Sequence, residues 1–389
     1  MAKKVRVGVL FGGRSAEHEV SLVSAASVLR ALDPAKYDVI PIGITKQGRW
    51  VLPQALAQGN RPALKEASLT HSDLRRAFDH SAAVVLPAEP SQGTLIPAAS
   101  TESPSQPFHL DVVFPVLHGT FGEDGTVQGL LELADIPYVG AGVLGSAVGM
   151  DKDVQKRLFR QAGLPVADYL AVRRQEWDTN RKAVLRAVRR LRLPVFVKPA
   201  NLGSSVGISK VSRWAALPEA MEHAFEFDKK VLVEQGITGR EIEVSVLGNE
   251  EPKASLPGEV IPAREFYDYT AKYLEESTRF VVPAKLTPRQ TRRFQELAVA
   301  AFRATECEGM ARVDFLLSRR SGKIYISELN TIPGFTAISM YPKLWQASGL
   351  SYSELVDRLI ELALERHREK SRRRFSVELP RQRGGVMKE

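Results

Sequence analysis

A lysine followed by a loop of glycine and serine stands near the middle of the chain, at residues 198–207 (KPANLGSSVG). Glycines let backbone N–H groups approach an anion closely, serine hydroxyls add donors, and Lys198 supplies a fixed positive charge. The pattern differs from a Walker loop, because no Gly-Lys-Ser/Thr opens a helix. The spacing therefore predicts a lid over phosphate groups, with a flexible hairpin turn as the alternative.

Two carboxylates and an amide recur at alternate positions of two neighbouring segments, at Asp314 in Arg-Val-Asp and at Glu328 and Asn330 in Glu-Leu-Asn. Residues two apart on a strand face the same side, and residues 318–322 are short enough to join the segments as a hairpin. Hard oxygen ligands of this kind suit Mg²⁺ held jointly with substrate phosphates. Arg312 beside them can stabilise oxyanion charge. The alternative is a surface ladder of salt bridges, which the apolar residues between them argue against: Val313, Phe315 and Leu329.

Further loops carry weaker signals. Residues 12–19 (GGRSAEHE) and 118–125 (HGTFGEDG) each follow an apolar run, and a carboxylate such as Glu17 could hold an ammonium group there. His118 could equally be a structural cap. Residues 333–335 (PGF) follow the acidic hairpin, where Gly334 would permit an unusual backbone turn that offers an N–H to an oxyanion, or simply an ordinary turn. The aromatic loop 266–273 (FYDYTAKY) reads as a packing loop or as a lid with an inward Lys and Tyr.

The elements that must position these loops alternate between strand and helix in the first third of the chain. Apolar runs predict strands at 5–11, 37–44, 82–86 and 111–117, with helices at 21–32 and 126–134. This α/β pattern predicts a mainly parallel sheet, whose ligands collect at the carboxyl ends of its strands. Residues 87–107 interrupt it with five prolines and six Ser/Thr, which predicts a surface insertion.

The remainder is expected to be an α+β region. Helices are predicted at 151–161, 179–190, 288–305 and 353–368, and strands at 195–198, 206–210, 231–235, 241–247, 311–317 and 324–329. We expect an N-terminal substrate-binding domain at 1–150, a central lid domain at 151–245, a C-terminal nucleotide- and metal-binding domain at 246–370, and a basic tail at 371–389.

Composition is that of a globular protein, with 389 residues, 44% hydrophobic and 25% charged. Most of the net charge of +9 lies at the end, because residues 366–389 hold nine Lys/Arg against three Asp/Glu. The rest is nearly neutral, so we expect neither nucleic acid nor membrane as a partner, and the basic end reads as solvated. The chain opens without an apolar leader and has one cysteine, Cys307, which favours the cytoplasm.

In combination, these motifs resemble the D-alanine–D-alanine ligase family of the ATP-grasp superfamily over roughly residues 4–368. The resemblance implies an ATP-grasp fold with a Rossmann-like N-terminal domain, and an ATP-dependent synthesis of D-alanyl-D-alanine through a D-alanyl phosphate, for peptidoglycan precursors. It also implies ATP and two Mg²⁺ ions, for which Mn²⁺ can substitute, and a homodimer.

The resemblance assigns roles residue by residue. Glu17 would hold the first D-alanine's ammonium near His118, and would form a hydrogen-bonded group with Ser204 and Tyr273. Arg312 and the Gly334 N–H would stabilise the oxyanion. Ser339 and Met340 would bind the carboxylate of the second D-alanine. Residues implied to bind the nucleotide are Lys152, Lys198, Ser205, Glu234, Gln235, Ile237, Glu241, Phe266 and Lys272. Those implied to ligate metal are Asp314, Glu328 and Asn330.

Three alternatives remain at this stage. Another ATP-grasp carboxylate–amine ligase would share the nucleotide and metal residues without the loops of Glu17 and Tyr273. A relative that uses D-lactate is disfavoured by the loop at 266–273. A non-enzymatic nucleic-acid-binding module is disfavoured by the near-neutral body of the chain.

Overall fold

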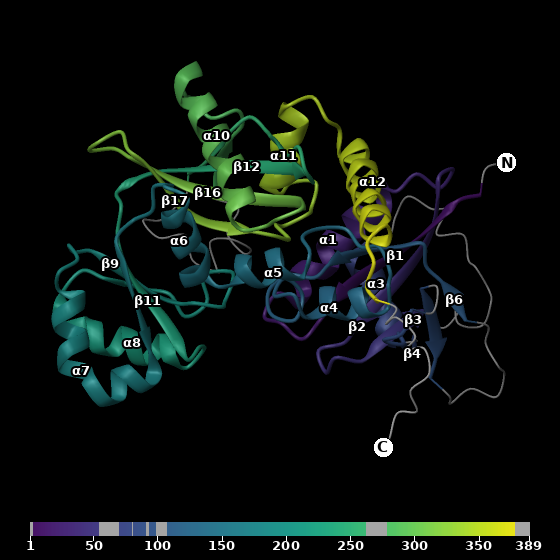
Figure 1. Ribbon diagram of the computed structural model, residues 1–389, viewed down its shortest axis with the longest axis horizontal. Coiled ribbons are helices and arrows are strands. Elements are labelled where there is room, and N and C mark those ends of the chain that lie inside the picture. Colours follow the sequence, from purple (N-terminus) through teal and green to yellow (C-terminus); the bar gives the residue numbers. More distant parts are fainter. Residues whose placement is uncertain are drawn as a thin grey trace, which may run out of the picture.

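The structure is a computed structural model, and it describes residues 3–53, 70–79, 81–90, 93–98, 107–261 and 278–377. Three sheets organise these residues (Figure 1), and they are named here the N-terminal, central and C-terminal sheets. Within the described ranges, no helix is long and apolar enough to cross a bilayer.

The N-terminal sheet has seven strands in the order β6-β5-β4-β3-β2-β1-β7. Only β1 with β2 and β1 with β7 pair in parallel, and the other four pairings are antiparallel. The expected mainly parallel sheet is therefore found only around β1, which is where both glycine-rich loops leave the sheet. The strands are β1 (Val5–Gly12), β2 (Tyr37–Ile44), β3 (Trp50–Pro53), β4 (Ser81–Val85), β5 (Thr94–Pro97), β6 (Phe108–His109) and β7 (Val112–Val116).

The segment 87–107, expected to be a surface insertion, contributes a strand to this sheet. β5 pairs with β4 and β6, and its Leu95 is fully buried in the core beneath the sheet. Among the described prolines of the segment, Pro97 ends this strand, and Pro87, Pro90 and Pro107 lie outside it. Proline content alone thus concealed a short strand.

Helices cover both faces of the N-terminal sheet. Because strand side chains alternate, Val7 and Val9 of β1 pack in one core with α1 (His18–Ala31) and α12 (Tyr352–Ser371), while Leu10 faces the core of α4 (Thr126–Leu133). This part of the chain holds two more helices, α3 (His71–Asp79) and α5 (Val143–Met150). The carboxyl ends of β1 and β7 are left open for their loops.

The central sheet is antiparallel, in the order β10-β9-β11-β8, and its core lies against α7 and α8. Its strands are β8 (Tyr169–Arg173), β9 (Val195–Pro199), β10 (Ser209–Val211) and β11 (Lys230–Gln235); the helical segments are α7 (Arg174–Val188), η1 (Trp214–Ala216) and α8 (Leu217–Phe225). Strand β10 begins later than the predicted residue 206, because Gly207 has φ +71° and keeps the preceding loop out of the ladder. Helix α7 begins before the predicted residue 179, and Asn180 inside it has non-helical backbone angles.

The C-terminal sheet runs β15-β14-β12-β16-β17, with β13 paired to β12. Its strands are β12 (Gly239–Gly248), β13 (Lys253–Ala254), β14 (Gly258–Ile261), β15 (Arg279–Val281), β16 (Gly309–Ser318) and β17 (Ile324–Asn330). One face packs on α10 (Pro288–Ala304) and on Phe159 of α6 (Lys152–Gln161), and α11 (Met340–Ala347) also contacts β12. The predicted boundary at residue 245 falls inside β12, all of whose residues pair with β16, so the chain passes between the two sheets at residues 236–238.

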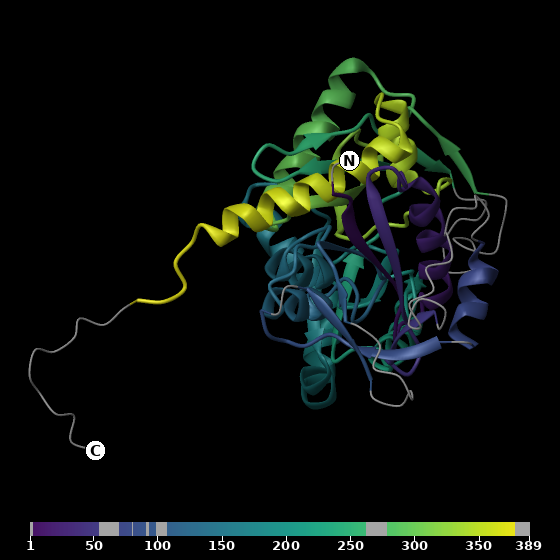
Figure 2. The ribbon, with the colours of Figure 1, turned by 90° about the vertical axis from the view of Figure 1, so that its right-hand side faces the viewer.

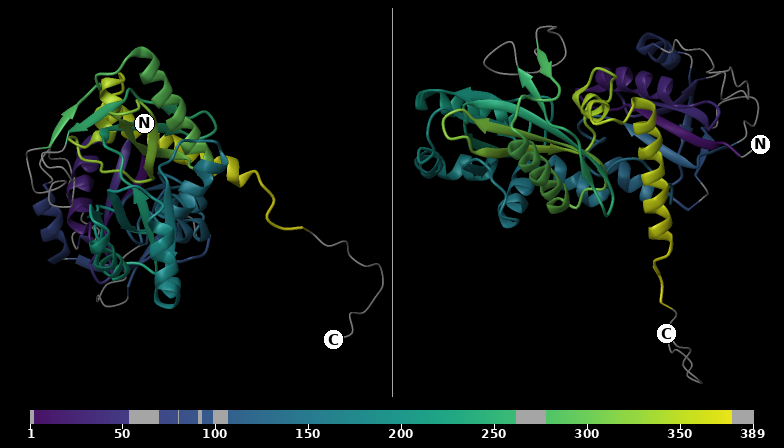
Figure 3. Two further views of the ribbon diagram at one scale, coloured as in Figure 1. Left: turned by 90° about the vertical axis from the view of Figure 1, so that its left-hand side faces the viewer. Right: turned by 90° about the horizontal axis from the view of Figure 1, so that it is seen from above.

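The last helix, α12, ties the C-terminal part of the chain back to the N-terminal sheet. It packs against α1 and β7 (Figure 1), and its second half contacts residues 132–140 through Arg366 and Lys370. The chain after the helix extends away from the body in the turned views (Figures 2 and 3). The side-by-side placement of the first and last elements brings the loops after β1 and β7 close to residues 332–335, which precede α11.

Candidate active site

The loops that follow β1 and β7 meet at Glu17. The Ser15 hydroxyl donates to the backbone carbonyl of His118 at 2.7 Å, and the Glu17 N–H donates to the same hydroxyl oxygen at 3.0 Å. Gly119 has φ +76°, and a Cβ there would stand 2.8 Å from Glu17 Oε2. The two loops therefore close around one carboxylate that is 8% exposed.

The loop between β9 and β10 reaches over this carboxylate, which places Ser204 beside Glu17 as the family resemblance implies. The Ser204 hydroxyl donates a hydrogen bond to Glu17, and a Cβ at Gly203 would lie 3.1 Å from Glu17 Oε2. Ser204 and Ser205 both have positive φ, at 51° and 59°. Left-handed backbone at two consecutive non-glycine residues is uncommon and strained, and such strain concentrates at binding sites.

His118 is buried beneath the two loops, with 3% of its side chain exposed. Its Nδ1 donates to the Ile332 carbonyl at 3.0 Å, and its Nε2 lies 3.0 Å from the Ser24 hydroxyl. Burial alone would lower the pKa of His118, but the carboxylates of Glu123 and Glu17 outweigh it and raise the pKa above its ordinary value. A cationic imidazole near Glu17 is thus favoured.

Two lysines converge on Glu234 at the end of β11. Lys198 of β9 lies 2.6 Å from Glu234 Oε2, and Lys156 of α6 lies 2.6 Å from Glu234 Oε1. Lys156 also donates to the Ser327 carbonyl of β17 at 2.7 Å. All three groups are largely inaccessible to water, so this ion triad joins the central sheet, α6 and the C-terminal sheet.

The charges of this triad shift its pKa values in opposite directions. Burial would raise the pKa of Glu234, but Lys156 and Lys198 outweigh it and hold that pKa at about 2. Burial lowers the pKa of Lys156, against the attraction of Glu234. Lys198 remains charged, because Glu234 and the more distant Glu328 and Glu241 raise its pKa despite burial.

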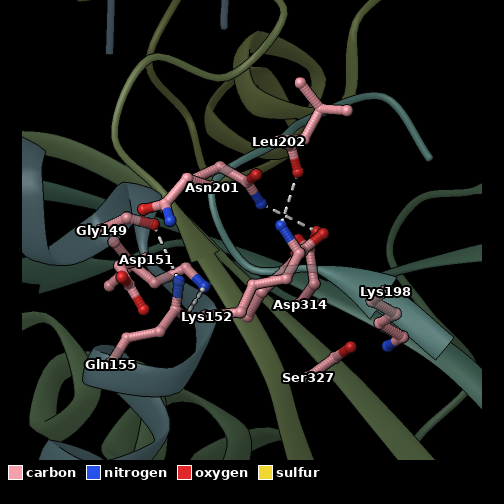
Figure 4. Close-up of polar contacts among 12 residues, drawn as sticks. Gly149, Asp151, Lys152, Gln155, Lys198, Asn201, Leu202, Asp314 and Ser327 are labelled. Carbon is pink, nitrogen blue, oxygen red and sulfur yellow. Dashed lines mark hydrogen bonds and ion pairs between the residues drawn. The ribbon is translucent and has the colours of Figure 1, made fainter. Parts of the chain in front are cut away.

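Lys152 connects the serine-rich loop to the acidic hairpin. It is the first residue of α6, which Asp151 caps by accepting from the N–H groups of Asp153 and Val154. Its amino group donates to the Leu202 carbonyl at 2.7 Å and lies 3.3 Å from Glu328 Oε2. Figure 4 shows Lys152 beneath the Leu202 carbonyl, with Asp314 close by. A helix N-terminus that presents a lysine is well suited to an anion.

The predicted hairpin of β16 and β17 is confirmed. Arg312 is paired with Asn330, and Asp314 with Glu328, with a register shift directly after Asp314. The Arg312 Nε and Nη2 atoms donate to the two oxygens of Asp314 at 2.6 and 2.7 Å, and Asn330 Nδ2 donates to Asp314 Oδ2 at 3.0 Å. These side chains share one face of the sheet, opposite the core that holds Val313 and Leu329.

The donor set of this hairpin fits a magnesium ion that is completed by its substrate. Two carboxylates and one amide oxygen are hard ligands, and Mg²⁺ commonly takes one or two carboxylates together with phosphate oxygens. Among the described residues, no group of three or more His, Cys, Asp or Glu side chains stands ready to hold a metal alone. Any ion here would therefore need further oxygen ligands, such as water or phosphate.

The segment after the hairpin departs from one expectation. Gly334 does not have a positive φ, so its role is not an unusual turn; a Cβ there would lie 3.1 Å from Ser339 Oγ, which instead explains a small residue. Ser339 is the N-cap residue of α11, and its hydroxyl bonds to Thr336. Met340 has a buried side chain, so only its backbone, at the helix start, is suited to meet a ligand.

The predicted adenine hinge lies where the central sheet passes into the C-terminal sheet. Gln235 ends β11, Ile237 lies in the connecting loop, and Glu241 stands on β12, opposite Leu316. The Gly236 N–H donates to the Pro194 carbonyl at 2.8 Å, which fixes the loop. Three further predicted site residues lie outside the described ranges: Phe266, Lys272 and Tyr273.

Two charged residues at this site were not found by sequence reasoning. Lys156 follows Lys152 by one helical turn, and that spacing was the available signal. Glu243 of β12 stands opposite Asp314, with Oε2 at 3.2 Å from Arg312 Nε. Its place depends on which strand lies beside β16, and no local pattern reveals that.

Comparison with known proteins agrees with this arrangement. The family model described as D-ala D-ala ligase N-terminus matches residues 6–141, and that described as D-ala D-ala ligase C-terminus matches residues 158–361. Together they span most of the chain, including the loops of Glu17 and His118 and the acidic hairpin.

Individual relatives align over nearly the whole chain. D-alanine--D-alanine ligases of Solibacter usitatus and Geobacillus thermodenitrificans are 50% and 49% identical, each over 96% of this chain and 99% and 100% of their own length. Among solved structures, the VanG D-Ala:D-Ser ligase of Enterococcus faecalis has a TM-score of 0.81 at 37% identity, covering 93% of this chain and all of that one. The D-alanine-D-alanine ligase of Coxiella burnetii has a TM-score of 0.78 at 38% identity, covering 95% and 97%. This chain belongs to the D-alanine–D-alanine ligase family.

Proposed function

We propose that this protein uses ATP to join two molecules of D-alanine into D-alanyl-D-alanine, for peptidoglycan precursors. The observation that supports it best is a continuous chain of contacts: Glu17 with Ser204, Leu202 of the same loop with Lys152, and Lys152 with Glu328. One loop thus links an ammonium-binding carboxylate to a phosphate-binding lysine and an acidic hairpin. A ligase that activates an amino acid with ATP needs these three groups around one space.

In this proposal, the nucleotide lies between the central and C-terminal sheets. Lys152 and Lys198, with Lys272, bind its phosphates beneath Ser205, and the hinge binds its adenosine through Glu234, Gln235, Ile237, Glu241 and Phe266. When the nucleotide binds, Lys198 gives up part of its contact with Glu234 and contacts phosphate oxygens instead. Lys156 then keeps the Glu234 carboxylate ionised. Asp314, Glu328 and Asn330 hold two Mg²⁺ ions, or Mn²⁺, which neutralise phosphate charge when bound.

The first D-alanine lies on the floor formed by the loops after β1 and β7. Glu17 binds its ammonium and His118, whose pKa its carboxylate neighbours raise, lies near its carboxylate, which orients a carboxylate oxygen for attack on the γ-phosphate of ATP. ADP leaves, and the product is an acyl phosphate, whose phosphate is a far better leaving group than an oxide. Ser204 and Tyr273 close the loop and exclude water from this species.

The second D-alanine binds through its carboxylate at the start of α11, at Ser339 and the Met340 N–H. Its free amine attacks the acyl carbon, the C–N bond forms, and phosphate departs with the oxygen it received. Negative charge collects on the tetrahedral oxygen, where the Arg312 guanidinium and the Gly334 N–H stabilise it. The amine must lose a proton before or during attack, so the reaction favours neutral to alkaline pH. We also propose a homodimer that works in the cytoplasm.

The direct test is phosphate release from ATP and Mg²⁺ with single amino acids added. D-Alanine is expected to give one phosphate per dipeptide, and L-alanine none. D-Serine and D-lactate, offered together with D-alanine, test the acceptor, because one solved relative is named as a D-Ala:D-Ser ligase. Phosphate release that is independent of D-alanine, or a mixed product formed in preference to D-alanyl-D-alanine, would contradict the proposal.

A further inference from the structure

Arg312 has two carboxylate neighbours, and only one of them belongs to the proposed metal site. Asp314 binds its Nε and Nη2 edge in a bidentate pair. Glu243 approaches the same Nε at 3.2 Å from the strand on the other side. The two pairs are well shielded, since the side chains of Arg312, Asp314 and Glu243 are 19%, 18% and 12% exposed.

The topology of the sheet places these acids in a row. Glu243 of β12 is the register partner of Asp314 on β16, and Asp314 is the partner of Glu328 on β17. Paired residues of neighbouring strands point to the same face, so three carboxylates cross the sheet side by side. Lys152 lies at the Glu328 end of this row, and Arg312 lies between Asp314 and Glu243.

The two ends of the row therefore differ in what they can do. Glu328 contacts Lys152, which we assign to phosphate, whereas Glu243 lies beside Nε of the Arg312 guanidinium. Within the described part of the chain, the hydrogen bonds of the Arg312 guanidinium use Nε and Nη2, so Nη1 keeps its hydrogens for a reacting oxyanion. Nε donates its one hydrogen to Asp314, so Glu243 holds the guanidinium by charge, without using a hydrogen of Nη1.

We propose that Glu243 is a positioning residue that holds Arg312 for catalysis. This inference rests on the proposed function. In the proposed function Asp314 would ligate the metal as well as pair with Arg312. Metal binding at its oxygens would therefore weaken the ion pair between Asp314 and Arg312. Glu243 provides the anchor that is independent of the metal. Arg312 is strongly held in its charged form, because the charges of Asp314 and Glu243 outweigh burial and raise its pKa well above the ordinary value.

Glu243→Gln is the appropriate change, since it removes the charge and keeps the size and one acceptor. We expect kcat to fall by about 10- to 100-fold, the range typical for loss of a supporting group behind a reactive one. KM for ATP and the affinity for Mn²⁺ with a non-hydrolysable ATP analogue, measured by calorimetry, should stay close to wild type. Glu243→Asp retains the charge and should restore most of the lost rate.

A poorly aimed guanidinium should also uncouple the reaction. The ratio of ATP consumed to dipeptide formed is expected to rise above unity in Glu243→Gln, because acyl phosphate that is not captured by the amine is hydrolysed. A residue with a purely structural role would lower both rates together and leave this ratio unchanged.

Glu259→Gln is the matched control. Glu259 forms a closer pair with Arg240 in the same sheet, at 2.7 Å, but it stands opposite Ile242, on the face away from Glu243. It should leave kcat and the coupling ratio unaltered. The inference is overturned if Glu243→Gln behaves like this control, or if it loses nucleotide–metal affinity in proportion to kcat. An inactive wild-type protein would instead contradict the proposed function itself.

Discussion

At the scale of single residues, Glu234 shows how burial and charge compete. Its pKa is about 2 in the folded protein, against an ordinary 4.5, because two lysines outweigh its burial. The folded state therefore binds this proton more weakly than the unfolded chain does. The resulting stabilisation, on the order of 3 kcal/mol, is complete above about pH 4.5 and is lost as the pH falls toward 2.

Lys156, the partner of Glu234 that the sequence did not reveal, allows a test of this ion triad. Lys156→Met is expected to lower the free energy of unfolding at neutral pH by about 3 kcal/mol, since it leaves a buried carboxylate with one cation fewer. It should also flatten the dependence of stability on pH below 4.5, because the pKa of Glu234 rises toward its ordinary value. Urea unfolding across this range measures both effects. Lys156→Arg, which keeps the charge, is the control, and an unchanged acid dependence in Lys156→Met would refute the assignment.

The metal proposal is also decided by one residue. Asp314→Asn preserves shape and hydrogen bonding to Asn330 but removes the negative charge that a divalent ion requires. We expect it to abolish turnover while circular dichroism shows an intact fold. Near-normal activity of this variant at low Mg²⁺ would remove Asp314 from the metal site.

At the scale of elements, the acidic hairpin was predictable and its surroundings were not. The alternation of Arg312, Asp314, Glu328 and Asn330 with apolar residues, and the short turn between them, are local signals that specify a strand pair. Glu243 joins them only because β12 lies beside β16, which is a long-range pairing. The short strand β5 was missed for a related reason: proline and serine predict a loop, but burial of Leu95 beneath the sheet overrides them.

The loop between β9 and β10 offers a prediction at this scale. Gly207 has φ +71°, and a Cβ there would approach Phe227 to 2.7 Å and Pro199 to 2.8 Å. Gly207→Ala should therefore displace the loop and weaken binding of an ATP analogue by about tenfold, from roughly 1–3 kcal/mol of backbone strain and crowding. Limited proteolysis should then show less protection of residues 201–208 by the analogue.

Gly163→Ala separates the effect of a side chain at positive φ from the effect of crowding in the loop. Gly163 has the same φ of +71°, but a Cβ there meets no atom within 4 Å. It follows the end of α6, so its substitution should cost general stability without affecting nucleotide binding. If Gly163→Ala weakened binding as much as Gly207→Ala, the loop would have no special part in holding phosphate.

At the scale of the whole molecule, α12 holds the two ends of the chain together. Arg366 donates to the Tyr138 carbonyl at 2.9 Å, stacks over the Tyr138 ring at 4.5 Å, and lies 3.6 Å from Glu308. Arg366→Ala is expected to lower the free energy of unfolding by about 1–3 kcal/mol, measured by thermal unfolding.

The basic end of the chain beyond this clamp should be dispensable. Helix α12 ends at Ser371, and the side chains of Phe375 and Val377 are 75% and 88% exposed. Deletion of residues 374–389 is thus expected to leave both stability and turnover unchanged. A folded but inactive truncation would show that these residues complete the site or a subunit interface.

The hydrogen bond from Ser204 to Glu17 joins segments 187 positions apart and covers the floor of the site. In the proposed function Glu17 binds the ammonium of an amino acid, so this contact stands over the place where that amino acid would enter and leave. Every cycle must consequently break and remake it, once to admit reactants and once to discharge the dipeptide. The turnover rate then depends on how long the loop stays closed over Glu17 as well as on the rate of the chemical steps.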